Sequence, residues 1–266
     1  MFTASRAARV VGHSAWASTA RRHIAELAAH DRCVLIVGPP SSGRTVMARA
    51  IHEHSTRRAW PFVPVRCDRL PGHLFSSQFF GCAPHENGTP RKGTLGAARA
   101  ADGGTLFLAR VDELDPLAQW ELLGFLAHRE ARPVGGEGSI HTNARIVASC
   151  SPDIFDAINW GRFDADLFEA LAGCVLETLD LARRVVDIAP LAEHYLHARC
   201  ERLGLPAKTL APSAVDLLIS QPWPGNIGQL RSLMEGLAGD EHTTTIDHET
   251  IRVWLAQRDA RSVLLR

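Results

Sequence analysis

One eight-residue segment constrains the fold of this chain more than any other. Its members form the glycine-rich pattern of a phosphate-binding loop: Gly38, Pro39, Pro40, Ser41, Ser42, Gly43, Arg44 and Thr45. The pattern G-x-x-x-x-G-K-[ST] is met at both glycines and at its last position, but arginine replaces the lysine. Glycines at this spacing let successive backbone N–H groups curl around an anion, and the start of a following helix adds partial positive charge.

The segments on either side of the loop support this interpretation. Residues 33–37 are a short apolar run, typical of a buried strand in a parallel sheet. Val46, Ala50 and Ile51 then follow at helical spacing. Strand, glycine loop and helix, in this order, are the context that the motif requires. The alternative is a glycine-rich turn that binds nothing.

Composition narrows the function further. With 266 residues, 45% of them hydrophobic, the chain can bury one large core or two modest ones. Its formal net charge is zero, so the strong basic surface of a nucleic-acid-binding protein is missing. Lysine occurs only at Lys92 and Lys208 among 29 basic residues. This general preference for arginine weakens any functional meaning of a single lysine-to-arginine change.

The sequence also predicts a cytoplasmic location. No apolar run is long enough to span a bilayer, and residues 1–11 lack the apolar core of a secretory signal. The cysteines are scattered, without any C-x-x-C pair, and we expect free, mostly buried thiols and no metal site. They are Cys33, Cys67, Cys82, Cys150, Cys174 and Cys200.

The patterns along the chain predict an α/β domain followed by a small helical domain. Apolar runs predict strands at 33–37, 62–67, 105–111, 144–149 and 174–179. Helical spacing covers 14–30, 45–56, 70–79, 116–129 and 164–171, and this alternation favours a parallel, doubly wound sheet. From about residue 185 only helices are expected, with no strand between them, at 187–203, 212–220, 225–238 and 247–257.

Several segments together resemble the central AAA+ ATPase domain of sigma-54-dependent transcription activators. The matching residues include Val11-Gly12-His13-Ser14, Ala50-Ile51-His52, Pro61-Phe62-Val63, Gly103-Gly104-Thr105-Leu106-Phe107-Leu108, Arg145-Ile146-Val147-Ala148, Asp187-Ile188-Ala189-Pro190-Leu191-Ala192 and Trp223-Pro224-Gly225-Asn226. The resemblance covers nearly the whole chain. It implies an AAA+ P-loop domain, with a parallel sheet sandwiched by helices, at residues 8–182, and a C-terminal helical lid domain at 183–260.

The chain departs from this family where hydrolysis would take place. In the family, the strand that Gly103–Leu108 resembles ends in an aspartate that holds Mg²⁺ and a glutamate that orients the attacking water. Ala109 and Arg110 stand at these positions, and neither side chain can do that work. Asp112 and Glu113 follow shortly, and we interpret them as ordinary surface or helix-entry residues.

The family's other catalytic and contact positions are replaced as well. Ser151 and Gly228 stand where the family has two sensor residues. Asp164 and Ala170 stand where it has the two arginines that act on a neighbouring subunit, and residues 85–90 stand where it has the loop that contacts sigma-54. Arg162 and Arg231 lie near two of these positions, but we interpret both as surface arginines. We therefore predict no catalytic residue and no metal ligand.

Two interpretations of the arginines at the loop remain open. The family's lysine, two carboxylates and Mg²⁺ sum to about +1, whereas Arg44 and Arg110 without a metal sum to about +2. ATP or ADP would then bind to residues 38–45 and Arg110 without Mg²⁺. Alternatively, arginine does not fit the lysine's place, the loop is empty, and both arginines pair with local carboxylates.

Three functions follow from the resemblance. The favoured one is a pseudo-ATPase module of transcription regulation. Its partners would be further copies of this chain, AAA+ relatives or the sigma-54 RNA polymerase. The alternatives are a working ATPase that activates sigma-54 transcription, and a purely structural oligomerisation module. About fifteen residues follow Asp247–Ile251, too few for a helix-turn-helix, so we expect no direct DNA binding and no membrane contact.

Overall fold

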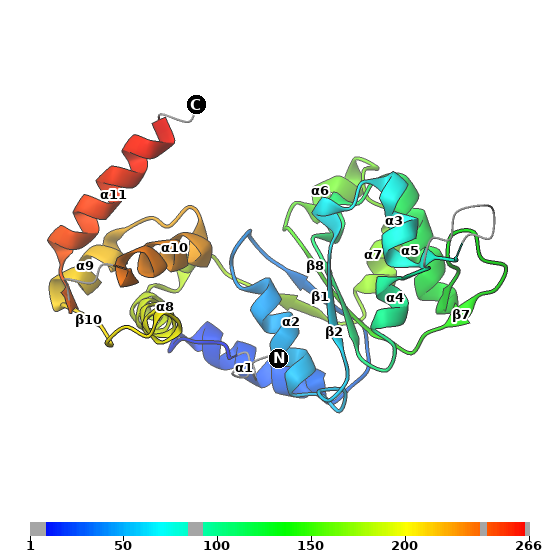
Figure 1. The fold of residues 1–266 in the computed structure, drawn as a ribbon, viewed down its shortest axis with the longest axis horizontal. Helices are drawn as coiled ribbons and strands as arrows, with labels where there is room; N and C mark the ends of the chain where they lie inside the picture. Colours follow the sequence, from blue (N-terminus) through cyan, green and yellow to red (C-terminus); the bar gives the residue numbers. More distant parts are fainter. Residues whose placement is uncertain (1–8, 85–92, 240–243, 264–266) are drawn as a thin grey trace. The chain divides into compact units, whose positions relative to one another are not determined.

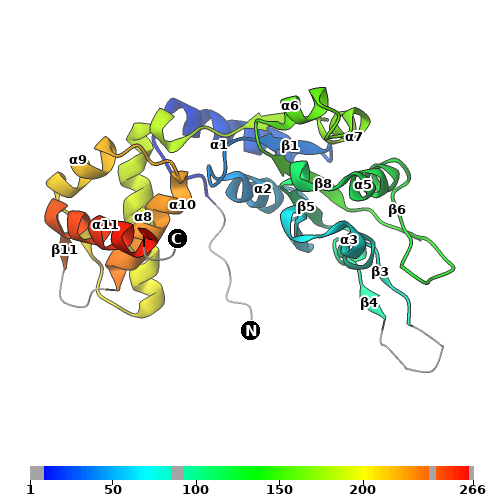
Figure 2. The same ribbon diagram turned by 90° about the horizontal axis from the view of Figure 1, so that it is seen from above.

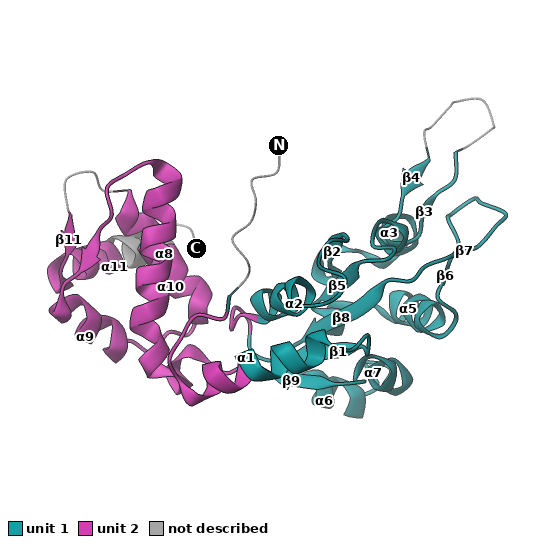
Figure 3. Cartoon of the chain, turned by 90° about the horizontal axis from the view of Figure 1, so that it is seen from below, with its two compact units in different colours: residues 1–9, 21–39, 44–178 teal, residues 10–20, 40–43, 179–266 magenta. Residues whose placement is uncertain are grey.

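The structure is a computed structural model that describes residues 9–84, 93–239 and 244–263. The chain forms two compact units (Figure 3). Unit 1 contains residues 21–39 and 44–178, and unit 2 contains residues 10–20, 40–43 and those from 179 onward. Helix α1 (Ala15–Ala28) therefore contributes residues to both units.

Unit 1 is built on a five-stranded parallel sheet (Figure 1), with the strand order β2-β5-β8-β1-β9 (Figure 3). The strands are β1 (Val34–Val37), β2 (Phe62–Arg66), β5 (Thr105–Ala109), β8 (Arg145–Cys150) and β9 (Val175–Glu177). All five were predicted, and the parallel α/β class is confirmed. The inner strands β1 and β8 are buried at every residue, as continuous apolar runs on both faces require.

Helices cover both faces of this sheet (Figure 2). Helix α2 (Arg44–Glu53) packs on β1, β5 and β8 from one side. On the other side, alternate strand residues such as Leu35 and Leu106 share one core with the remaining long helices. These are α3 (Gly72–Phe79), α5 (Pro116–His128) and α7 (Ala165–Leu171). The shorter helices α4 (Ala97–Ala100) and α6 (Ile154–Asn159) contribute residues to the same core.

The predicted strand at 105–111 is two residues too long. It ends at Ala109 because Arg110 has a positive φ of 61°, which breaks the extended backbone, and the 3₁₀ turn Val111–Glu113 follows. Two antiparallel ladders were not predicted. They join β3 (Gly81–Cys82) to β4 (Thr94–Leu95) and β6 (Glu130–Ala131) to β7 (Ile140–His141).

Unit 2 is mainly helical, with α8 (Ile188–Leu203), α9 (Pro212–Ser220), α10 (Asn226–Ala238) and α11 (His248–Val263). The prediction of no strand in this region is wrong, because β10 (Thr209–Leu210) and β11 (Thr245–Ile246) form a parallel ladder. The apolar core centres on Trp223 and α10. Buried Asp187 ties down the segment before α1, accepting hydrogen bonds from the backbone N–H groups of His13 and Ser14 at 2.7 Å.

Candidate functional site

The predicted phosphate-binding loop follows β1 at the carboxyl edge of the sheet. This is the edge where ligands bind in open α/β sheets. Gly38 donates its N–H to Cys150 O at 3.2 Å, so the loop leaves the sheet beside the end of β8. A Cβ atom at Gly38 would lie 1.8 Å from Thr178 Oγ1, and only glycine fits this exit. The first glycine of the motif is therefore required by close backbone packing.

The loop then curls through two residues with positive φ. Ser41 has a φ of 58° and Gly43 a φ of 113°. The second value requires glycine, whereas the first is a left-handed conformation that serine adopts at a cost. Helix α2 begins directly afterwards, at Arg44. The loop thus has the local geometry that aims backbone N–H groups and a helix start at one point.

Residues 40–43 of the loop pack within unit 2. Three consecutive carbonyl groups of this stretch accept hydrogen bonds, and each donor comes from unit 2. The pairs are Asn226 Nδ2 to Pro40 O at 3.2 Å, Ile227 N to Ser41 O at 3.2 Å and Arg184 Nη2 to Ser42 O at 2.6 Å. The guanidinium of Arg184 also lies 4.3 Å from the centre of the Trp16 ring. These bonds fix the peptide planes of the loop.

The same packing explains Gly228, the position where a sensor arginine was expected. A Cβ atom at Gly228 would lie 2.9 Å from Ser41 Oγ, so the loop itself takes the space of a side chain there. Arg231, one helical turn further on, bonds Glu235 Oε1 at 3.0 Å. It is thus bound as a surface arginine, as predicted.

Arg44 is the charged residue of the loop. Its exposed fraction is only 8%, and its Nη1 has no hydrogen-bond partner among the described residues. Burial lowers the pKa of Arg44, and the carboxylate of Asp112 opposes that shift. Such a nitrogen loses its hydration without replacement, as Nε of the buried Arg145 and Arg184 also does among the described residues.

Arg110 stands in a different environment. Its side chain is 40% exposed, and its Nη1 donates to Asp68 Oδ2 at 3.2 Å while Nη2 donates to Glu113 Oε1 at 2.6 Å. Asp68 also accepts two hydrogen bonds from Arg66, at 3.0 and 2.5 Å. The interpretation in which Arg110 pairs with local carboxylates therefore describes this arginine, but it leaves Nη1 of Arg44 without a partner.

Asp112 lies in the first turn of the 3₁₀ helix Val111–Glu113 and is half-buried. Its Oδ2 accepts the backbone N–H of Ser151 at 3.0 Å, and its Oδ1 is buried without a partner among the described residues. It was expected at the surface or at a helix entry, and the 3₁₀ turn after Arg110 also brings its carboxylate to the backbone of Ser151 at the end of β8. Ser151 itself accepts from Asp153 N through its hydroxyl.

The end of β5 itself offers no side-chain oxygen ligand for Mg²⁺. That ion requires carboxylate or other oxygen ligands, and at the end of β5 the chain offers the methyl group of Ala109 and the cation of Arg110. In the part of the chain that the structure describes, no group of three or more His, Cys, Asp or Glu residues could hold a metal ion.

Of the two residues at the family's trans-acting arginine positions, Asp164 has a structural role and Ala170 has none that the structure shows. Asp164 caps the first turn of α7 by accepting the N–H of Leu167 at 2.8 Å, and Ala170 is exposed. Arg162 lies over the ring of Trp160 at 4.6 Å. The expected sigma-54 contact loop at 85–90 lies outside the described residues.

Comparison with known proteins agrees with this arrangement. Residues 10–177 match the Sigma-54 interaction domain, and residues 182–263 match the AAA+ ATPase lid domain. The chain belongs to the sigma-54 interaction domain family. Its parallel AAA+ sheet and C-terminal helical lid are those of a domain found in transcription regulators.

Individual relatives show the extent of the match. The transcriptional regulatory protein ZraR of Salmonella typhimurium is 37% identical over 80% of this chain and 48% of its own length. The Nif-specific regulatory protein of Azotobacter vinelandii is 35% identical over 91% of this chain and 46% of its own. The chain thus spans about half the length of these curated relatives. NtrX from Brucella abortus, crystallised with ADP, superposes with a TM-score of 0.81 at 29% identity, over 91% of this chain and 55% of that one.

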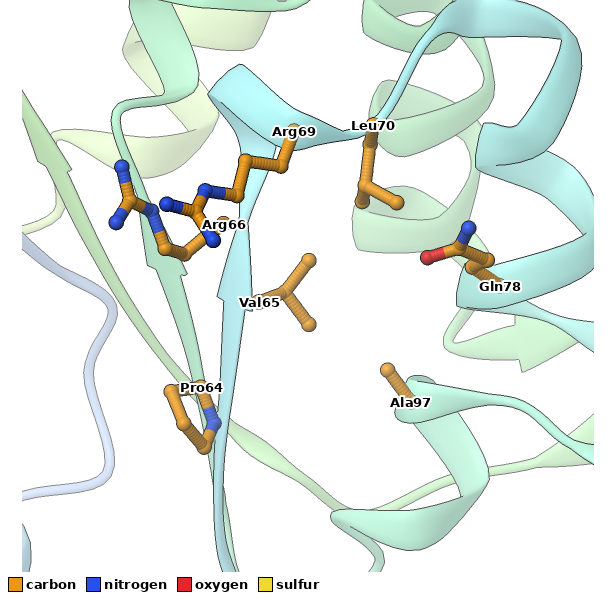
Figure 4. A pocket seen from close by; sticks show the side chains of 7 residues that line it. All are labelled: Pro64, Val65, Arg66, Arg69, Leu70, Gln78 and Ala97. Atoms are coloured by element: carbon orange, nitrogen blue, oxygen red, sulfur yellow. The ribbon is translucent and has the colours of Figure 1, made fainter.

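Two further observations concern the rest of this sigma-54 interaction domain. A pocket of about 250 Å³ lies beside β2, lined by Val65, Arg66, Arg69, Leu70 and Gln78 among others (Figure 4). It is open and half polar, and it lies away from the loop residues 38–45. Among the described residues, no helix is both long and apolar enough to cross a bilayer.

Proposed function

We propose that this sigma-54 interaction domain is a pseudo-ATPase, which keeps the nucleotide-binding loop and has lost hydrolysis. The observation that carries the proposal is the end of β5, where Ala109 and Arg110 replace a metal ligand and a catalytic base. Phosphoryl transfer depends on positioning and on charge stabilisation, so each missing group costs orders of magnitude in rate, about 10³–10⁵ for an arginine finger. Ser151, Asp164 and Gly228 add to the same loss.

The proposed ligand is ATP or ADP at residues 38–45. The positive-φ curl at Ser41 and Gly43 and the helix start at Arg44 support it. The related NtrX from Brucella abortus, whose crystal structures contain ADP or ATP, provides a precedent at the level of the fold. Because Arg110 is already bound by two carboxylates, we assign it a secondary role in nucleotide binding.

The proposed role is regulatory and works through protein contacts. Partners of the appropriate kind are further copies of this chain, working AAA+ relatives, and the sigma-54 RNA polymerase to which the family name refers. A module that binds nucleotide without consuming it would hold such partners in one state. Co-purification of tagged protein with sigma-54, and separately with a working relative, measures this. Recovery of neither would contradict the regulatory role.

Release of inorganic phosphate tests the pseudo-ATPase proposal. Purified protein is incubated with ATP and Mg²⁺, alone and with a working relative as the positive control. We expect no release above the rate without protein. Release by the chain alone that Arg44→Met abolishes would show a working ATPase and overturn the proposal.

A further inference from the structure

We propose that the loop binds its nucleotide as a metal-free anion, with Arg44 as the cation and Asp112 as a nearby carboxylate that opposes the phosphate charge. This inference rests on the proposed nucleotide binding and specifies its chemistry. It concerns the charged groups at the carboxyl ends of β5 and β8, all within unit 1.

Arg44 carries the argument, because it combines burial with an unpartnered donor. The residue is more than nine-tenths buried at the first position of a ten-residue helix, directly after the glycine loop. Its Nη1 lacks a partner among the described residues. A phosphate oxygen would supply that partner, since guanidinium groups bind phosphate through parallel N–H···O bonds. The unsatisfied donor and the helix start therefore point to one anion.

The charges around Arg44 specify which form of the nucleotide would bind. Arg110 and Arg66 are balanced by Asp68 and Glu113, so these four residues sum to zero, and the count of +2 for Arg44 and Arg110 leaves out these two carboxylates. What remains is Arg44 with Asp112 nearby. Mg²⁺ would find the methyl group of Ala109 in place of a carboxylate at the end of β5. A nucleotide without Mg²⁺ needs no such ligand.

Asp112 has opposite effects on nucleotide binding in the account without Mg²⁺ and in the account with Mg²⁺. With its Oδ1 unpartnered and its charge felt by Arg44, Asp112 competes with phosphate when no metal is bound. If Mg²⁺ did bind, the same oxygen would be its one nearby carboxylate ligand at this edge. Replacing Asp112 by asparagine keeps an oxygen for the Ser151 N–H and removes only the charge. The two accounts therefore predict opposite changes.

The experiment is a titration of the full chain with fluorescently labelled ADP, and separately ATP, in excess Mg²⁺ and in EDTA. We expect affinity in EDTA to be equal to or tighter than that in Mg²⁺, by up to about tenfold. Tighter binding in Mg²⁺, or no saturable binding in either buffer, would overturn the inference. Neither result would by itself restore hydrolysis, so a failure here is distinct from a failure of the pseudo-ATPase proposal, which phosphate release decides.

Three variants complete the test. Asp112→Asn should bind the nucleotide in EDTA at least about threefold more tightly, because a competing anion is gone. Unchanged or weaker binding would refute the role of Asp112. Arg44→Met should lose more than about tenfold in both buffers. Arg49→Ala is the matched control, because Arg49 lies on the same helix with its guanidinium over Phe62 at 4.6 Å, and it should bind as the unmodified chain does.

Discussion

The two ends of β5 use charged and polar side chains in contrasting ways. At the amino end, Thr105 Oγ1 lies 2.9 Å from His52 Nδ1, and Arg57 donates to the carbonyl groups of Gly103 and Asn143 at 3.0 and 2.5 Å. Arg57 also forms two 2.9 Å bonds to Asp31. Each of these contacts joins segments far apart in the sequence. These contacts bond this end of the strand, although Nε and Nη1 of Arg145, opposite Thr105 on β8, are buried without a partner among the described residues.

At the carboxyl end, the most deeply buried charged groups are incompletely bonded. Arg44 Nη1 and Asp112 Oδ1 are both buried without partners among the described residues. Unsatisfied groups of this kind destabilise a fold, and a ligand that completes them is one explanation for their presence. The comparison teaches that arginine alone indicates nothing about function. Its bonding does, and the following tests, from the largest expected effect to the smallest, challenge that distinction.

The largest expected effect is on the alkylation rate of two thiols at the carboxyl edge of the sheet. Burial raises the pKa of both Cys67 and Cys150 to about 12. A raised thiol pKa keeps the unreactive neutral form dominant at every pH below that value, so alkylation increases only as the pH approaches it. At pH 8 we expect iodoacetamide to react about 10³-fold more slowly than with an exposed cysteine. Mass spectrometry of timed samples measures the rate at each site, and rapid labelling of either would show that this edge is open to solvent.

Arg57→Ala should give the largest loss of stability. It removes a cation from two backbone carbonyl groups at the amino end of β5 and leaves them without their donor, at a cost of about 3 kcal/mol in the free energy of unfolding. Urea denaturation followed by far-ultraviolet circular dichroism measures it. The neighbouring exposed Arg58→Ala is the control and should cost less than about 0.5 kcal/mol. Equal losses for the two variants would remove the contrast between the ends of the strand.

Unlike Arg57→Ala, Arg44→Met should not lower the free energy of unfolding. Methionine fills a similar space without a buried charge, so we expect the free energy of unfolding without nucleotide to stay level or to rise by about 1 kcal/mol. The same urea series measures it. Destabilisation as large as that of Arg57→Ala would mean that Arg44 is a structural residue, as its counterpart at the amino end is.

Arg110→Ala should change stability least. Its two ion pairs are 40% exposed on the arginine side, and exposed pairs contribute less than about 1 kcal/mol. Thermal unfolding at low and high salt measures this contribution, which should shrink as salt screens the pairs. A loss above about 2 kcal/mol would show a buried, essential network instead.

The sequence predicted the scaffold well because the scaffold follows regular patterns. Buried strands such as Val34–Val37 are continuous apolar runs, and helix starts such as Pro212 carry their own signals. The two-residue ladders, including β10 with β11, escaped because they are too short to show a period of two. The loop at 38–45 was located by spacing alone.

The hydrogen bonds and ion pairs at the site could not be predicted from the sequence. The pair between Arg110 and Asp68 joins residues 42 apart in the chain, and it forms because the β2–β5 register places Arg66 opposite Ala109. The inward turn of Asp112 depends on the positive φ of Arg110, a conformation that arginine rarely adopts. Neither a long-range register nor a left-handed residue leaves a local pattern in the sequence.

A single-turnover measurement tests the central claim most directly. The protein, in large excess over γ-labelled ATP with Mg²⁺, is followed for hours, so that even one slow event per site is counted. The account predicts that the label stays in ATP as it does without protein, for the unmodified chain and for Arg44→Met alike. Faster release by the unmodified chain, lost in Arg44→Met, would contradict the account and show that the family's chemistry survives at this edge.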